Sequence, residues 1–220
     1  ILWTPLILYP PMMQDLQNYP EDLTGVFLAL RGLGTLCGST LLVFINKKLD
    51  PRFILSVGFL LQGIAGFYMS HFDINLSAFE LAWTNSLAGL GVGFVWVPLT
   101  LITFNTLDKK FLNEASAFWH LIRNIGSSIS ISITIALVIR STAINYADLS
   151  SFISIFGDST SVMPLKGTTA PSGVESLSGL SKEIVRQSEM IGYINAFHLY
   201  YWIAFSIIPL VWLAPLKPQN

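Results

Sequence analysis

The chain has 220 residues, of which 52% are hydrophobic and 11% are charged, and its mean hydropathy is +0.60. Soluble globular domains carry about 25% charged residues, so this composition argues against a soluble domain and indicates a protein whose solvent is lipid. The formal net charge of -1 says little, because in membrane proteins the placement of Lys and Arg matters more than their sum. The single cysteine, Cys37, excludes an intramolecular disulfide and a cysteine-based metal site.

The hydrophobic residues form stretches that are long enough to cross a bilayer as helices. Residues 1–13 resemble the tail of one such span, which Pro5, Pro10 and Pro11 kink or end. Five full spans follow at residues 23–45, 53–70, 79–107, 115–139 and 191–214, each compatible with the roughly 20 residues that a bilayer requires. The predicted fold class is therefore all-α, a polytopic membrane helical bundle of five full helices and one partial helix. Because the chain begins at Ile1 within an apolar run, we expect a fragment of a longer protein.

The basic residues of the short loops gather on one side of the predicted bundle. Loops at residues 14–22 and 71–78 contain no Lys or Arg, whereas the loops at 46–52 and 108–113 carry Lys47, Lys48, Arg52, Lys109 and Lys110. Cytoplasmic loops are enriched in Lys and Arg, so the basic loops are predicted to be cytoplasmic. The long polar stretch 141–190 then lies outside as a long loop. Its part at 159–179, rich in Ser, Thr, Gly and Pro, is predicted to be irregular, and residues 181–190 are predicted to extend the final helix outward.

The most informative pattern is a polar stripe in the span at residues 115–139. Its members lie three or four residues apart, so they stack along one side of a helix. They are Ser116, His120, Arg123, Ser127, Ser130 and Thr134, with Asn124 next to Arg123 in the chain. Polar and cationic groups are costly in lipid, and this cost is lowest where they face a water-filled cavity or a polar partner. The stripe therefore predicts the wall of a pathway.

Two arginines lie within the predicted spans. Arg123 is about nine residues into its helix, hence about 14 Å deep, which is too deep for its side chain to reach the headgroups easily. We interpret it either as a residue of substrate passage, coupling or gating, or as a structural hub between helices. His120, one turn earlier, is either a proton carrier or a neutral residue that hydrogen-bonds or stacks on substrate. Arg31, nearer the outer face, either reaches the outer headgroups or caps the pathway opening.

The span at residues 79–107 contains Gly89, Gly91 and Gly93 at alternate positions, followed by Pro98. Glycine lowers helix stability by about 1 kcal/mol, and proline removes a backbone hydrogen bond. The pattern indicates either a hinge that bends during gating or close packing around small residues. No Asp or Glu lies deep in any predicted span. A carboxylate that couples transport to protons is therefore expected in the missing part of the protein.

Three sequence motifs within the predicted spans resemble a known family. The strings RNIGSSISISI at residues 123–133 and GVGFVWVPLT at residues 91–100 are similar to the 14-helix drug:proton antiporters of the major facilitator superfamily, in the EmrB/QacA-like branch. LRGLGTL at residues 30–36 resembles the preceding helix of that branch, and the cytoplasmic loop follows it. Where the superfamily has Gly, Asp and a basic cluster, this loop keeps only Lys47, Lys48, Asp50 and Arg52, and we interpret it as a degenerate copy.

The resemblance implies two pseudosymmetric bundles around a cavity that opens alternately to either face, of which this chain supplies the last helices of the C-terminal half. It implies proton-driven export of lipophilic or amphipathic compounds across the bacterial inner membrane. The expected partners are the lipid bilayer, the missing N-terminal helices, a periplasmic adaptor and an outer-membrane channel. No cofactor, metal or nucleic acid is expected.

Other functions stay open beside this one. A dedicated metabolite or siderophore exporter has the same fold, and the residues do not separate it from a multidrug pump. A non-transporting scaffold or receptor needs no polar stripe. A membrane-embedded enzyme should show clustered His, Asp or Cys near one interface, and the three scattered histidines and one cysteine argue against it.

Overall fold

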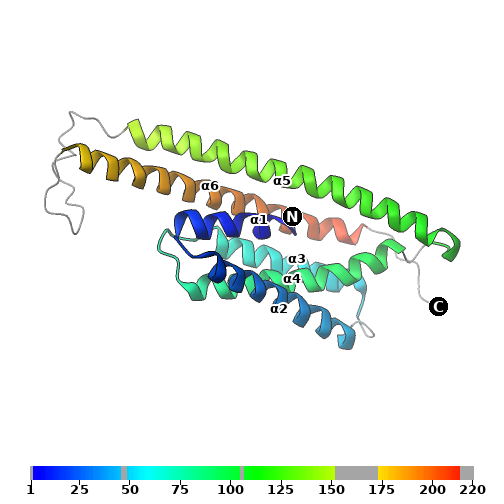
Figure 1. Ribbon diagram of the computed structural model, residues 1–220. Coiled ribbons are helices and arrows are strands. Elements are labelled where there is room, and N and C mark those ends of the chain that lie inside the picture. Colours follow the sequence, from blue (N-terminus) through cyan, green and yellow to red (C-terminus); the bar gives the residue numbers. More distant parts are fainter. Residues whose placement is uncertain (1, 46–48, 105–106, 152–172, 214–220) are drawn as a thin grey trace.

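The computed structural model describes residues 2–45, 49–104, 107–151 and 173–213, and these residues form helices with short connections (Figure 1). No strand occurs within these ranges, so the predicted all-α fold class is confirmed. In chain order the elements are α1 (Thr4–Pro11), the π-helical turn η1 (Met12–Leu16), α2 (Glu21–Ile45), α3 (Pro51–Met69), α4 (Ala78–Phe104), the 3-10 turn η2 (Lys109–Phe111), α5 (Leu112–Ser151) and α6 (Gly173–Trp212).

The described residues contain 5 helices that are long and apolar enough to cross a membrane, namely α2 to α6. The chain is therefore a multi-pass membrane protein, as its hydropathy predicts. The boundaries differ by a few residues from the predicted ones. Helix α3 begins at Pro51, because proline fits the first turn of a helix, where its missing N–H is not needed. Helix α4 ends at Phe104, before the polar loop that leads to α5.

Helices α5 and α6 are much longer than the predicted spans at residues 115–139 and 191–214. Each has 40 residues, hence a length of about 60 Å, roughly twice the thickness of the hydrocarbon core. The long loop predicted at 141–190 is therefore helical at residues 141–151 and 173–180, and the irregular part predicted at 159–179 is wrong from residue 173 onward. At residues 141–151 the side chains become more polar, which ends the apolar stretch. These residues contain no Gly or Pro, so the helix itself continues. The helical extension predicted at 181–190 is confirmed, and residues 152–172 lie outside the described residues.

The partial span continues beyond its predicted end at residue 13. Helix α1 contains Pro10 and Pro11 and passes directly into the π-helical turn η1. Prolines and π turns are both common where a helix changes course. The chain then turns at Asn18, whose φ of 54° lies in the left-handed region that Asn tolerates better than most residues. This turn leads into α2.

The helices form two groups that meet through α6 and α1. Helices α2, α3 and α4 pack together, and α5 and α6 run side by side as a long hairpin that extends beyond the other group at one end (Figure 1). Helix α6 also packs on α3. The larger hydrophobic core lies where α1, η1, α3 and α6 meet, and it includes Tyr9, Met13, Phe72, Phe197 and Tyr200. Most of α5 is exposed, since its buried residues are Thr134 and Ser141.

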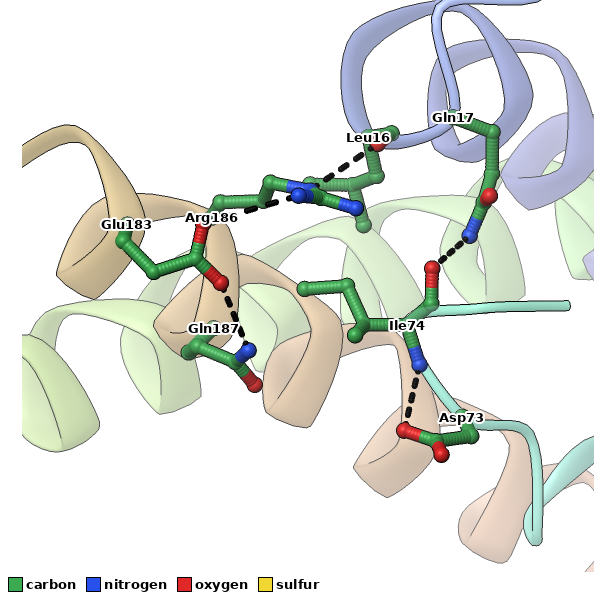
Figure 2. Close-up of polar contacts among 7 residues, drawn as sticks. All are labelled: Leu16, Gln17, Asp73, Ile74, Glu183, Arg186 and Gln187. Carbon is green, nitrogen blue, oxygen red and sulfur yellow. Dashed lines mark hydrogen bonds and ion pairs between the residues drawn. The ribbon is translucent and has the colours of Figure 1, made fainter. Parts of the chain in front are cut away.

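Polar bonds join α6, the segment at η1 and the α3–α4 connection (Figure 2). The Arg186 guanidinium donates to the carbonyl of Leu16 at 3.2 Å, and it lies 3.5 Å from the Glu183 carboxylate. The amide of Gln17 donates to the carbonyl of Ile74 at 2.6 Å. These contacts join three elements that are distant in sequence.

Candidate functional site

The polar stripe of α5 lies partly on its inner side. Thr134 is buried, whereas His120 and Asn124 are exposed. The remaining members are half-buried, namely Ser116, Arg123, Ser127 and Ser130. The hydroxyls of Ser127 and Thr134 donate to carbonyls of their own helix, at 2.9 and 2.8 Å. Each hydroxyl keeps a lone pair that can still accept a hydrogen bond from a ligand.

A cavity of about 350 Å³ lies between α1, α5 and α6. This volume is near the lower end of the range for small-molecule sites. Hydroxyl groups contribute at four positions of an otherwise apolar wall, which is the usual composition of a site for an amphipathic ligand. The lining residues are Thr4 from α1, then Gly126, Ile129, Ser130, Ile133 and Thr134 from α5, and Ala196, Leu199, Tyr200 and Ile203 from α6. The structure thus brings Ser130 and Thr134 of the stripe to one cavity.

Arg123 is held by aromatic rings. Its Cζ lies 5.1 Å from the ring centre of Trp96 on α4 and 5.2 Å from that of Trp119 on α5. The two indoles are 6.0 Å apart and nearly perpendicular, and the rings of Phe104 and His120 flank Trp119 at 6.0 and 5.0 Å. A guanidinium over an indole face is stabilised by about 0.5 to 2 kcal/mol, depending on its desolvation. The cluster therefore forms an aromatic cage around a cation where α4 approaches α5.

Arg31 lies inside the bundle and not on its lipid-facing side. Its side chain is 6% exposed, and Nη2 donates to the carbonyl of Leu2 at 2.8 Å. Nη1 is buried and has no hydrogen-bond partner among the described residues. Of the two interpretations offered by the sequence, contact with the outer headgroups does not fit this position. Arg31 is a buried cation near the centre of the helix bundle.

Several buried polar residues were not predicted as site residues. The hydroxyl of Tyr9 is 2.9 Å from that of Thr84, and the hydroxyl of Tyr200 donates to Gln62. Gln62 in turn donates to the carbonyl of Ala88 at 2.8 Å. The side-chain amide of Asn85 donates to the carbonyl of Phe27 at 2.8 Å. The signal that could have found this network is the presence of Gln62 and Asn85, polar amides in the middle of apolar spans.

The glycines of α4 lie at close approaches to neighbouring helices. A side chain at Gly89 would collide with the backbone of Arg31, and one at Gly93 with the backbone of Thr35 and Ser39. Gly91 faces Gln62 of α3. Helix α4 continues as one helix through Pro98. These contacts favour the packing interpretation of the glycines over the hinge interpretation.

The cytoplasmic loop motif is described only in part, because Lys47 and Lys48 lie outside the described residues. Asp50 is exposed and precedes α3, and its carbonyl accepts the backbone N–H of Phe53 at 3.0 Å. Arg52 is half-buried in the first turn of α3. The described residues contain no cluster of His, Cys, Asp and Glu that could hold a metal ion.

No family model matches the chain. Curated relatives match most of it. The multidrug export protein EmrB of Escherichia coli K12 is 23% identical over 211 residues, or 95% of this chain. The probable multidrug resistance protein EmrY of the same bacterium is 28% identical over 216 residues, and the fatty acid resistance protein FarB of Neisseria gonorrhoeae is 22% identical over 212 residues. The chain spans 41% of the length of each of these relatives.

The matches to these exporters extend over the apolar helices and over the loops between them, since each covers 95% of the chain. The structure independently supplies an all-α bundle with 5 helices able to span a membrane. The chain is therefore similar over nearly its whole length to EmrB-like multidrug export proteins, the branch that its motifs around Arg123 and Gly91 resemble.

Proposed function

We propose that the protein containing this chain exports drugs or other lipophilic and amphipathic compounds across the bacterial inner membrane, by alternating access driven by proton entry. The observation that carries the proposal is the cavity between α1, α5 and α6, which is largely apolar and has hydroxyl groups in its wall. Such a wall binds an apolar body without a strict requirement for its shape and orients its polar groups.

Helix α5 supplies one wall of the pathway. Its inner side carries Ser130 and Thr134 at the cavity, and Arg123 lies further toward the cytoplasmic end in its aromatic cage. The opposite side of α5 is exposed and carries Ile residues, for example Ile125 and Ile139. In the proposed exporter this side faces either lipid or the partner bundle, and the pathway runs along the inner side.

The proton-binding group is proposed to lie in the part of the protein outside this chain. Glu80 and Glu114 lie at helix ends and are exposed, and the half-buried Glu183 and Glu189 of α6 precede the span predicted at 191–214. A proton relay through a membrane normally uses a buried carboxylate or histidine. The exposed His120 beside Trp119 is the candidate within this chain.

The proposed partners are a periplasmic adaptor and an outer-membrane channel, which would receive the exported compound. The outer parts of α5 and α6 extend beyond the thickness of the hydrocarbon core and are available for such a contact. A dedicated metabolite or siderophore exporter is the alternative within the same fold. It would show export of one compound class only.

The test is proton-driven efflux of ethidium by the full-length protein in inverted membrane vesicles. The variants are Arg123→Ala and Arg123→Lys, with Arg140→Ala as a matched control, because Arg140 is an exposed arginine of the same helix. We expect loss of efflux in Arg123→Ala at normal membrane insertion, and normal efflux in Arg140→Ala. Unchanged efflux in Arg123→Ala would mean that the polar stripe serves helix packing and not transport. No efflux of ethidium by the wild type would favour an exporter dedicated to one metabolite or siderophore.

A further inference from the structure

Arg31 is a buried cation with unused hydrogen-bonding capacity. One terminal nitrogen donates to the carbonyl of Leu2, and the other, Nη1, is buried without a partner among the described residues. A guanidinium group carries five N–H donors in a fixed plane, which matches the two oxygens of a carboxylate. The unpartnered nitrogen therefore marks the position at which a further acceptor is missing.

The missing acceptor should carry negative charge. A buried charge without a counter-charge is costly, and a water molecule or a carbonyl group satisfies a donor without neutralising the cation. The titratable groups that act electrostatically on Arg31 within the described residues are the phenols of Tyr9 and Tyr200. Both are neutral hydroxyls that already bond to Thr84 and Gln62. Among the described residues, no carboxylate is found to neutralise the positive charge of Arg31.

The surroundings of Arg31 adjoin the cavity. Tyr200, which interacts electrostatically with Arg31, is part of the cavity wall. Leu2, which accepts the bond from Nη2, lies two positions before Thr4, another part of that wall. Arg31 thus shares the neighbour Tyr200 with the cavity and bonds to the segment that leads into the cavity wall.

Asn85 adds a second unused group in the same region. Its Oδ1 atom is buried without a partner, while its Nδ2 donates to the carbonyl of Phe27 at 2.8 Å. Phe27 is one helical turn before Arg31 on α2, and Asn85 is one turn before Gly89, whose position is in contact with the backbone of Arg31. The unused donor and the unused acceptor thus lie one turn apart at the interface of α2 and α4.

We propose that Arg31 binds a carboxylate inside the membrane bundle, through the guanidinium nitrogen that has no partner in this chain. Two sources supply this chemistry: the headgroup of a lipophilic acid that occupies the cavity, or an acidic side chain from the part of the protein outside this chain. The first source rests on the proposed export function, whereas the second does not.

The first arm of the test is equilibrium binding of dodecanoate and of dodecanol to the full-length protein in nanodiscs, at a pH where the acid is ionised. The two probes share one alkyl chain and differ in headgroup charge. If the source is a bound acid, the wild type prefers dodecanoate by about tenfold or more, the range for a hydrogen bond between charged groups. Arg31→Gln then loses the preference, with dodecanol binding within about twofold of the wild type.

Two further variants make the binding result specific. Arg31→Lys keeps the charge without the planar fork, so we expect it to retain part of the preference. Arg140→Gln removes an exposed arginine from α5 and should retain all of it. Binding needs no proton gradient, so a protein that binds dodecanoate in this way but exports nothing would contradict the export function and leave the carboxylate site intact.

The second arm addresses an acidic side chain of the same protein. If that is the source, the wild type binds the two probes alike. Arg31→Gln then shows coupling in a double-mutant cycle of thermal stability with one intramembrane Asp→Asn or Glu→Gln variant of the remaining helices. Equal binding of the two probes, combined with no coupling to any intramembrane acid, would overturn the proposal.

Discussion

The guanidinium of Arg123 lies over the indole of Trp96, with 5.1 Å between its Cζ atom and the ring centre. The two residues belong to α5 and α4, so this contact joins two helices near the connection between them. The deep cation of the stripe is thus compensated by aromatic faces and not by an acid of the described residues. The electrostatic attraction of the two indole faces stabilises the cation that they hold.

Removing the ring should release Arg123 from its position. Trp96→Leu is expected to lower ethidium efflux nearly as far as Arg123→Ala, whereas Trp96→Phe keeps an aromatic face and should retain more activity. The lost interaction between the guanidinium and the ring is about 0.5 to 2 kcal/mol. If all of it contributes to transport, the apparent affinity for ethidium falls by up to roughly thirtyfold. Efflux in inverted vesicles measures it. Trp202→Leu is the control, since Trp202 is an exposed indole on α6, and a loss of efflux there equal to that of Trp96→Leu would contradict the cage.

Filling the cavity should impair transport without unfolding the protein. Gly126 lines the cavity, and a side chain there would meet no atom within 4 Å. Gly126→Leu is therefore expected to weaken binding of a lipophilic substrate, while the melting temperature stays unchanged or rises, because Leu is a better helix former than Gly. The matched control is Gly25→Leu, at a position that also has free space but does not line the cavity. If both variants bind substrate equally well, the cavity is not the substrate site.

The interface of α2 and α4 should not accept a larger residue at Gly89. A methyl group there collides with the backbone of Arg31, so Gly89→Ala is expected to destabilise the folded bundle by about 1 to 3 kcal/mol. Thermal unfolding of the full-length protein in detergent measures the change. Gly32→Ala on α2 has free space and should be neutral or stabilising. A Gly89→Ala protein with normal stability but slower transport would instead support a hinge.

The bond between Tyr200 and Gln62 should contribute to stability, because both side chains are fully or almost fully buried. Tyr200→Phe leaves an acceptor of Gln62 without its donor, which costs about 1 to 3 kcal/mol. Gln62→Leu removes the acceptor. The double variant should therefore lose less stability than the sum of the losses measured for the two single variants. Tyr201→Phe serves as the control at a half-exposed neighbour. Strict additivity of Tyr200→Phe and Gln62→Leu would show that the bond has no energetic role.

Hydropathy predicts the number and approximate positions of the spans, because each apolar stretch is longer than 18 residues and is separated from the next by polar loops. It does not predict how far α5 and α6 continue, since an apolar stretch marks the bilayer and not the helix. Residues 141–151 remain helical because they contain no residue that breaks a helix.

The sequence predicts only those residues of the site that lie on one face of a single helix. The spacing of Ser130 and Thr134 places them on one face of α5, and both line the cavity. Their neighbours across the cavity, such as Tyr200, depend on which helices pack together, and no spacing within a single helix contains that information. The same holds for Arg31. Its position in the sequence left a headgroup contact and a cap of the pathway opening as alternatives, and neither predicts that its side chain bonds to Leu2 of another segment.

The length of α5 and α6 has a mechanical consequence. Each helix is about 60 Å long, and only the inner part is enclosed by other helices of the described chain (Figure 1). When such a pair tilts about a pivot within the bilayer, its free end moves through a distance proportional to the length of the arm. In the proposed transport cycle, a small change of tilt around the cavity would therefore become a larger displacement at the free end of the pair.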